Sequence, residues 1–86
     1  MAIYVDDLSR YKTGLWCHMA TDGDLEELHS FAKKIGLKRA WFQDHHCVPH
    51  YDLRPSKRTL AIKEGAISTN TVEIMRRWRA REIAAG

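Results

Sequence analysis

The segment DLEELHSFAKKIG, residues 24–36, gives the clearest structural signal in the sequence. Its apolar side chains recur at the spacing of one helix face: Leu25, Leu28, Phe31 or Ala32, and Ile35. Asp24 is followed three residues later by Glu27, which resembles a capping box, and Gly36 is typical of the residue that ends a helix. We therefore expect a helix over residues 24–35.

Short apolar runs elsewhere in the chain predict the strands of a sheet: residues 3–5, 15–19, 40–43 and 66–69. The run at 40–43 is largely apolar, so we expect it to be a central strand. Two further helices are expected, one from Pro55 to the stop at Gly65 and one from Asn70 to about Ile83.

The segment 44–54 is polar and contains Pro49, so we expect a loop there. The resulting order of elements predicts an α/β fold, because helices that alternate with strands usually connect parallel strands. We expect one small layered domain, residues 1–86, with a short, mainly parallel sheet of three or four strands and about three helices.

The composition is that of an ordinary globular protein. Of 86 residues, 44% are hydrophobic and 29% charged. No apolar run approaches the roughly 18 residues of a membrane span, and the start of the chain does not resemble a signal peptide. Two cysteines, Cys17 and Cys47, are too few for a disulfide framework. We therefore expect a cytoplasmic protein with reduced thiols and no membrane partner.

Charge is distributed unevenly along the chain. Residues 1–52 contain eight acidic and six basic side chains, whereas residues 53–86 contain eight basic and three acidic ones. A basic C-terminal part suggests an anionic partner, such as a nucleotide, a nucleic acid or an acidic protein surface. The alternative is a solvated basic helix surface, and the net charge of +3 does not decide between them.

Polar side chains follow three of the expected strands, at Asp6-Asp7, at Gln43-Asp44-His45 and at Ser68-Thr69-Asn70. Because ligands bind beyond the carboxyl ends of parallel strands, we expect these groups to share one edge of the sheet. There, carboxylates of Asp6, Asp7 and Asp52 could hold a divalent cation, Mg²⁺ or Mn²⁺. The alternative for Asp6 and Asp7 is a pair of turn residues.

The segment 44–52 contains three histidines, a thiol and two carboxylates. It does not match a zinc signature, because Pro49 argues against the helix that would align His46 with His50, so Zn²⁺ is less favoured than Mg²⁺ or Mn²⁺. A metal-free alternative pairs His50 with Asp52 as an acid and base, with His18 as a second proton carrier.

Lys57 and Arg58 lie in the first turn of the expected second helix, where positive charge opposes the helix dipole. Helix-start amides with basic side chains are suited to a phosphate or carboxylate, so we expect Lys57, Arg58 and Gln43 to contact substrate. The structural alternative is an ion pair with Asp52 or Asp44. The three tryptophans, Trp16, Trp41 and Trp78, are expected in the core.

An ordered set of motifs spans the chain to Ala66: IYVDD at residues 3–7, Trp16-x-His18, LHxFA at 28–32, Phe42-Gln43, HYDL at 50–53, and Lys57-Arg58 followed by Ala61 and Gly65-Ala66. In this set the sequence resembles the family of small bacterial and bacteriophage proteins known as domain of unknown function 4031. The resemblance implies a bacterial or phage origin and brings no activity. The His45-His46-Cys47 segment lies outside this pattern. The resemblance therefore favours a different set of site residues: Asp6, His18, Gln43, His50, Asp52 and Arg58.

Two hypotheses follow, and the sequence leaves open whether the protein is an enzyme. In the first it is a hydrolase or nuclease-like enzyme acting on a nucleotide or nucleic acid, with Asp6, His18, His50 and Asp52 at the reacting centre. In the second it is a non-enzymatic, phage-encoded modulator that binds a host protein or nucleic acid through its basic C-terminal part.

Overall fold

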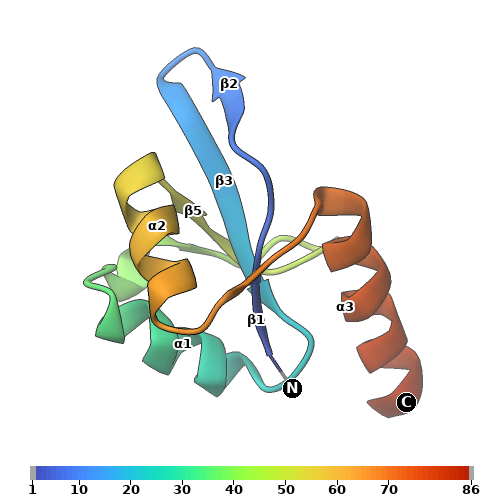
Figure 1. Cartoon of the computed structure of the whole chain (residues 1–86). Helices are drawn as coiled ribbons and strands as arrows, with labels where there is room; N and C mark the ends of the chain where they lie inside the picture. Colours follow the sequence, from blue (N-terminus) through green and yellow to red (C-terminus); the bar gives the residue numbers. More distant parts are fainter. Residues whose placement is uncertain (1, 86) are drawn as a thin grey trace.

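The central strand of the sheet is β3, Gly14–Thr21, the long strand in Figure 1. The computed structural model describes the backbone of residues 2–85 and the side chains of residues 2–81. The other strands are β1 (Ile3–Val5), β2 (Ser9–Tyr11), β4 (Phe42–Gln43), β5 (His50–Leu53) and β6 (Ile67–Ser68). The helices are α1 (Leu25–Lys34), α2 (Pro55–Lys63) and α3 (Thr71–Ala85), with a single 3₁₀ turn, η1, at Arg39–Trp41.

The sheet is mixed and mostly antiparallel, which corrects the expected mainly parallel sheet of three or four strands. Its order is β4-β5-β3-β1-β6, with β2 paired to β3, and only the β1–β6 pair is parallel. The expectation failed because most neighbouring strands are joined by short connections. The eight residues between β1 and β3 and the six between β4 and β5 contain no crossover helix, so these pairs run antiparallel.

Two local expectations were also wrong. Residues 40–43 form the end of η1 and the two-residue edge strand β4, and Trp41 is 48% exposed rather than in the core. The expected loop at 44–54 contains β5, in which Tyr51 and Leu53 are buried and alternate with the less buried His50 and Asp52. This alternation is typical of a half-buried strand.

The three helices lie where the sequence predicts them. Asp24 caps α1 by accepting a hydrogen bond from the Glu26 backbone, and Gly36 follows the helix with φ of 84°, a left-handed conformation that favours glycine. Pro55 is at the start of α2, and the Asn70 side chain accepts a hydrogen bond from the Glu73 backbone at the start of α3. Within the described part of the chain, no helix is both long and apolar enough to cross a membrane.

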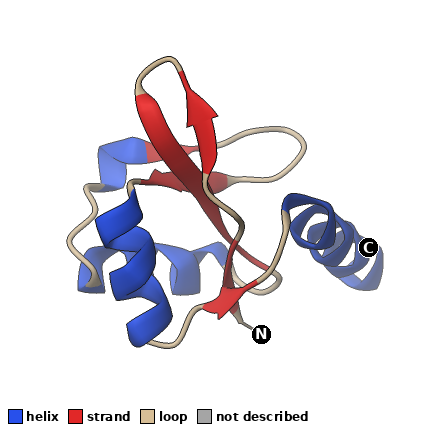
Figure 2. Ribbon diagram, turned by 45° about the horizontal axis from the view of Figure 1, so that its top comes forward, coloured by secondary structure: helices blue, strands red, loops and turns tan. Residues whose placement is uncertain are grey.

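The two faces of the sheet are covered differently, as Figures 1 and 2 show. Helices α1 and α2 cover one face and bury the main core against it: Val5, Cys17, Met19, Tyr51 and Leu53 from the strands, with Leu28, Ala32, Ile35 and Ala61 from the helices. Helix α3 covers part of the other face, where Ile74 and Trp78 pack on Tyr4 and Ala20. The rest of that second face is where the polar residues gather.

Candidate functional site

Asp6 is the buried polar centre of the site. It follows β1 and is only 1% exposed. One carboxylate oxygen accepts the backbone N–H of His18 at 2.6 Å. The other accepts from His18 Nδ1 at 2.7 Å and from the Thr71 hydroxyl at 2.6 Å. Asp6 therefore joins β1, the middle of β3 and the first residue of α3.

These contacts change the acid–base behaviour of both partners. Burial by itself raises the pKa of Asp6, but the hydrogen bonds from His18 and Thr71 outweigh it, so the pKa lies below its usual value. The pKa of His18 is raised by its hydrogen bond to Asp6, although burial opposes this shift. An ionised Asp6 requires a proton on Nδ1 of His18, which leaves Nε2 of the neutral ring as the nitrogen with a free lone pair.

Three side chains converge on the same face of the sheet as Asp6. His18 lies opposite Asp52 in the register of β3 and β5, and His50 precedes Asp52 by two residues, so all three point to one face. Nε2 of His50 is 3.5 Å from Asp52 Oδ1, and Nε2 of His18 is 4.0 Å from the same oxygen. One ligand atom from each residue lies within 4.8 Å of the other two, which is close enough for a single metal ion.

The remaining polar atom of each of these side chains is held by another group. Nδ1 of His18 bonds to Asp6, Nδ1 of His50 lies 2.8 Å from the Val48 carbonyl oxygen and donates to it, and Asp52 Oδ2 accepts from the Gln43 amide. Histidines and carboxylates that bind metals in proteins are oriented by outer contacts of this kind. The arrangement can therefore hold a divalent cation with two imidazole nitrogens and one carboxylate oxygen.

The site opens into two hollows. One, of about 400 Å³, contains His18, His50 and Asp52 together with Tyr11, Thr13 and Trp16 from the β2–β3 hairpin. The other, of about 280 Å³, lies toward α3 and includes Asp6, Thr71 and Met75. His45 lines both. A small molecule can therefore approach the histidines from the surface.

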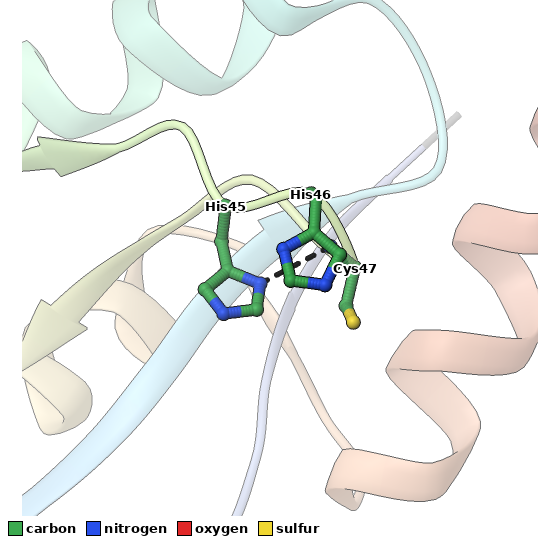
Figure 3. A group of neighbouring side chains, drawn as sticks. All are labelled: His45, His46 and Cys47. Atoms are coloured by element: carbon green, nitrogen blue, oxygen red, sulfur yellow. Dashed lines mark hydrogen bonds between the residues drawn. The ribbon is translucent and has the colours of Figure 1, made fainter.

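His45, His46 and Cys47 form an exposed cluster on the neighbouring loop (Figure 3). The two imidazole rings stack at 4.6 Å, and the Cys47 backbone donates a hydrogen bond to His45 Nδ1 at 3.1 Å. One ligand atom from each residue lies within 4.8 Å of the others. Because Nδ1 of His45 accepts a hydrogen bond, the neutral ring carries its proton on Nε2 and can donate to a bound group.

The acidic residues predicted to hold a cation separate into different places. Asp52 belongs to the His18–His50–Asp52 cluster. Both carboxylate oxygens of Asp6 accept hydrogen bonds from protein donors, so Asp6 orients His18 instead of offering a free ligand atom. Asp7 is exposed and lies outside the hollows around the histidines.

The basic residues predicted to contact substrate also separate. Arg58 donates from Nε to the Asp6 carbonyl oxygen at 2.8 Å and from Nη2 to the Ser68 hydroxyl at 2.9 Å, which fastens the end of β1 to β6. Lys57 donates to the Ile35 carbonyl oxygen at 2.7 Å and lines a third hollow together with Gln43.

Two residues of the site, Thr71 and Trp16, could not be recognised as site residues from the sequence, because neither residue type by itself indicates a functional role. Thr71 carries no signal beyond its position beside the capping residue Asn70, and it reaches Asp6 because α3 begins there. Trp16 was expected in the core, yet it lines the hollow that contains the histidines. The pattern that could have placed Trp16 is its even spacing from His18 on one strand, which puts both on the same face.

The chain belongs to the family described as protein of unknown function (DUF4031), whose model matches residues 3–81. No curated protein and no solved structure is similar enough to the chain to count as a match.

Proposed function

We propose that this protein is a metal-dependent hydrolase of phosphate esters, with a divalent cation held by His18, His50 and Asp52. The observation that supports it best is the restraint of all three side chains by outer hydrogen bonds, from Asp6, the Val48 carbonyl and Gln43. Isolated polar residues on a surface have no need of such restraint, whereas metal ligands regularly have it.

The donor set favours a late first-row ion over Mg²⁺. Two imidazole nitrogens and one carboxylate oxygen suit Zn²⁺, Fe²⁺ or Co²⁺, while Mg²⁺ and Mn²⁺ favour oxygen ligands and Mg²⁺ keeps several waters. We therefore propose a different ligand set from the one expected from the sequence, which combined Asp6, Asp7 and Asp52. Only Asp52 is common to both.

Three protein ligands leave at least one position for water, and a divalent ion there would lower the pKa of that water toward neutrality. Such an ion would supply an activated water to a bound phosphate ester: attack of the water oxygen on phosphorus would break the bond to the leaving oxygen, and the leaving oxygen would take the proton that the water loses. His45 lines the same hollow, and its Nε2–H would donate to the phosphoryl oxygen, where negative charge develops.

Metal binding tests the first part of the proposal. Protein stripped with EDTA is titrated with Zn²⁺, Mn²⁺, Co²⁺ and Mg²⁺ by calorimetry, with Co²⁺ absorption reporting the ligands. We expect one equivalent of a late first-row ion to bind, and Asp52→Asn to weaken it by at least the roughly 10- to 100-fold effect of losing an outer contact. Asp7→Asn, which alters an exposed carboxylate outside both hollows around the histidines, is the matched control and should bind normally.

Hydrolysis of bis(p-nitrophenyl) phosphate and of nucleotides tests the second part. Turnover should require the added ion and disappear in Asp52→Asn. Equal metal affinity in wild type and Asp52→Asn would refute the site. Tight metal binding without turnover on any phosphate ester would refute the hydrolase and favour the alternative, a non-enzymatic binding protein.

A further inference from the structure

A third hollow, of about 530 Å³, adjoins the proposed metal centre. It lies between η1 and the start of α2, where the short strand β4 leaves the edge of β5 uncovered. Trp16, Gln43 and Asp52 line both this hollow and the one that contains the two histidines. The two hollows are therefore parts of one groove that passes over Asp52.

Aromatic side chains lie along this groove on both sides of Asp52. Tyr11 and Trp41 are each 48% exposed, Tyr11 in the hollow with the histidines and Trp41 in the adjoining one. Trp16 lies between them, with its indole N–H bonded to the Thr13 hydroxyl at 2.8 Å. Large aromatic surfaces left open to water in a groove are typical of sites that bind flat, apolar groups.

Cationic side chains accompany these rings. The Arg54 guanidinium stacks 4.2 Å from the Trp16 ring centre, and Arg54 and Lys57 both line the hollow with Trp41. Among the residues with described side chains, no carboxylate lies within ion-pair distance of Arg54. Its positive charge is therefore available to an anionic ligand.

We propose that this groove binds single-stranded nucleic acid, with bases stacked on Tyr11 and Trp41 and the phosphate backbone near Arg54. Exposed aromatic rings combined with unpaired cations are the features that bind unpaired bases and their phosphates together. A duplex does not fit this chemistry, because its bases are stacked on each other and do not offer a face to an indole. The proposal rests on the proposed function only in placing the strand's phosphodiester beside His18, His50 and Asp52.

Binding can be measured separately from hydrolysis. EDTA-treated wild type and Asp52→Asn are titrated into fluorescein-labelled 12-residue oligonucleotides, and the anisotropy is recorded. One arm uses single-stranded DNA, one single-stranded RNA and one the DNA duplex. We expect Trp41→Ala to weaken binding of the preferred strand by roughly 5- to 150-fold, the effect of losing one stacked base. Val72→Ala, at an apolar position on α3 that is even more exposed than Trp41, is the control and should leave binding unchanged.

The charge of Arg54 has its own readout. Arg54→Met should reduce the slope of log Kd against log salt by about 0.7, the contribution of one phosphate contact on a single strand. Lys63 is an exposed lysine at the far end of α2 and lines none of the three hollows, so Lys63→Met should not change the slope.

The proposed groove is supported if either single strand binds more tightly than the duplex, if Trp41→Ala weakens this binding and if Arg54→Met reduces its salt dependence. The single strand that binds more tightly identifies the ligand as DNA or RNA. Failure to bind any single strand, equal binding of duplex, or an unchanged affinity in Trp41→Ala overturns it. Strand binding without cleavage leaves the groove in place and rejects the hydrolase. Hydrolysis of small phosphate esters without strand binding supports the hydrolase and rejects the groove as a strand-binding site.

Discussion

Replacing Asp6 with asparagine should change the position of one proton while keeping the shape of the site. The two side chains have nearly the same size, so the substitution needs no repacking of a group that is 1% exposed. The carboxylate accepts three hydrogen bonds, one from the His18 backbone, one from the His18 ring and one from Thr71. An amide offers one oxygen and one NH₂ group in their place.

The backbone N–H of His18 can only donate, so it holds the asparagine oxygen on its side. The NH₂ group then faces His18 Nδ1 and the Thr71 hydroxyl, which now have to accept. Thr71 can do so by rotating its hydroxyl, but His18 can do so only by moving its proton from Nδ1 to Nε2. Nε2 is the nitrogen that faces Asp52 and that we assign to the metal.

The expected magnitudes follow from these contacts. Hydrogen bonds to a charged group contribute roughly 1.5–3 kcal/mol each against roughly 0.5–1.5 kcal/mol for neutral ones, and the amide costs less to bury, so we expect a net loss of about 1–3 kcal/mol of folding stability. Metal affinity should fall by about 10- to 100-fold, the usual effect of removing an outer contact of a ligand histidine.

Long-range ¹H–¹⁵N correlation spectra distinguish the two neutral forms of His18, calorimetric titration with Zn²⁺ gives the affinity, and urea unfolding gives the stability. Asp22→Asn is the matched control. Asp22 also accepts two hydrogen bonds, from the Ala2 backbone and the Tyr4 hydroxyl, but at the opposite end of β1. Wild-type Zn²⁺ affinity in an Asp6→Asn protein whose His18 carries its proton on Nε2 would refute the assignment of His18 as a ligand.

Three further outcomes are expected. Because the pKa of His18 is raised, its pairing stabilises the fold fully below the ordinary value near pH 6.5, and this stabilisation is lost as pH rises through the raised pKa. Because the pKa of Asp6 is lowered, its contribution is present above about pH 4 and is lost on acidification. The difference in unfolding free energy between wild type and Asp6→Asn should therefore peak between these two limits, and a pH-independent difference would contradict the His18–Asp6 pair. Of the two thiols, exposed Cys47 should react at once with Ellman's reagent, while Cys17, whose burial raises its pKa to about 12, should react only on unfolding. Ile74→Ala should destabilise the protein by about 2–4 kcal/mol in urea unfolding, because this buried side chain anchors α3, and a loss near zero would show that α3 contributes little to the fold.

Local features of the fold could be predicted and pairing directions could not. The helix at Leu25–Lys34 follows from its cap, its apolar period and its terminal glycine, all within one segment. Strand direction depends on which distant segments meet. Strand β5 was missed because His50 and Asp52 gave its segment a polar composition, although their alternation with Tyr51 and Leu53 is the pattern of a strand with one face in the core.

The candidate site shows the same division. Of the side chains expected to gather, His18, His50 and Asp52 lie together with Gln43, and Asp6 contacts His18, whereas Asp7 lies apart. The antiparallel register of β3 and β5 sets His18 opposite Asp52, and only the contact between Asp6 and Thr71 lies at the carboxyl ends of parallel strands, β1 and β6. The different roles of Asp6 and Asp52 could not be predicted either, because they depend on burial: Asp6 is enclosed by its three donors, while the side chain of Asp52 is 36% exposed.

The arrangement of positive charge bears on the choice between the two sequence-based hypotheses. Much of the basic surface of α3 is engaged within the chain: Glu73 pairs with Arg76 at 3.3 Å and with Arg77 at 3.1 Å, and Arg81 donates to the Gly23 carbonyl oxygen. Arg54, by contrast, stacks on an aromatic ring beside Asp52. In the groove an anionic partner meets a cation that no carboxylate of the described side chains neutralises, whereas Arg76 and Arg77 on α3 already share Glu73. This arrangement favours a ligand that binds along the groove, across the proposed metal centre, rather than one that docks on α3.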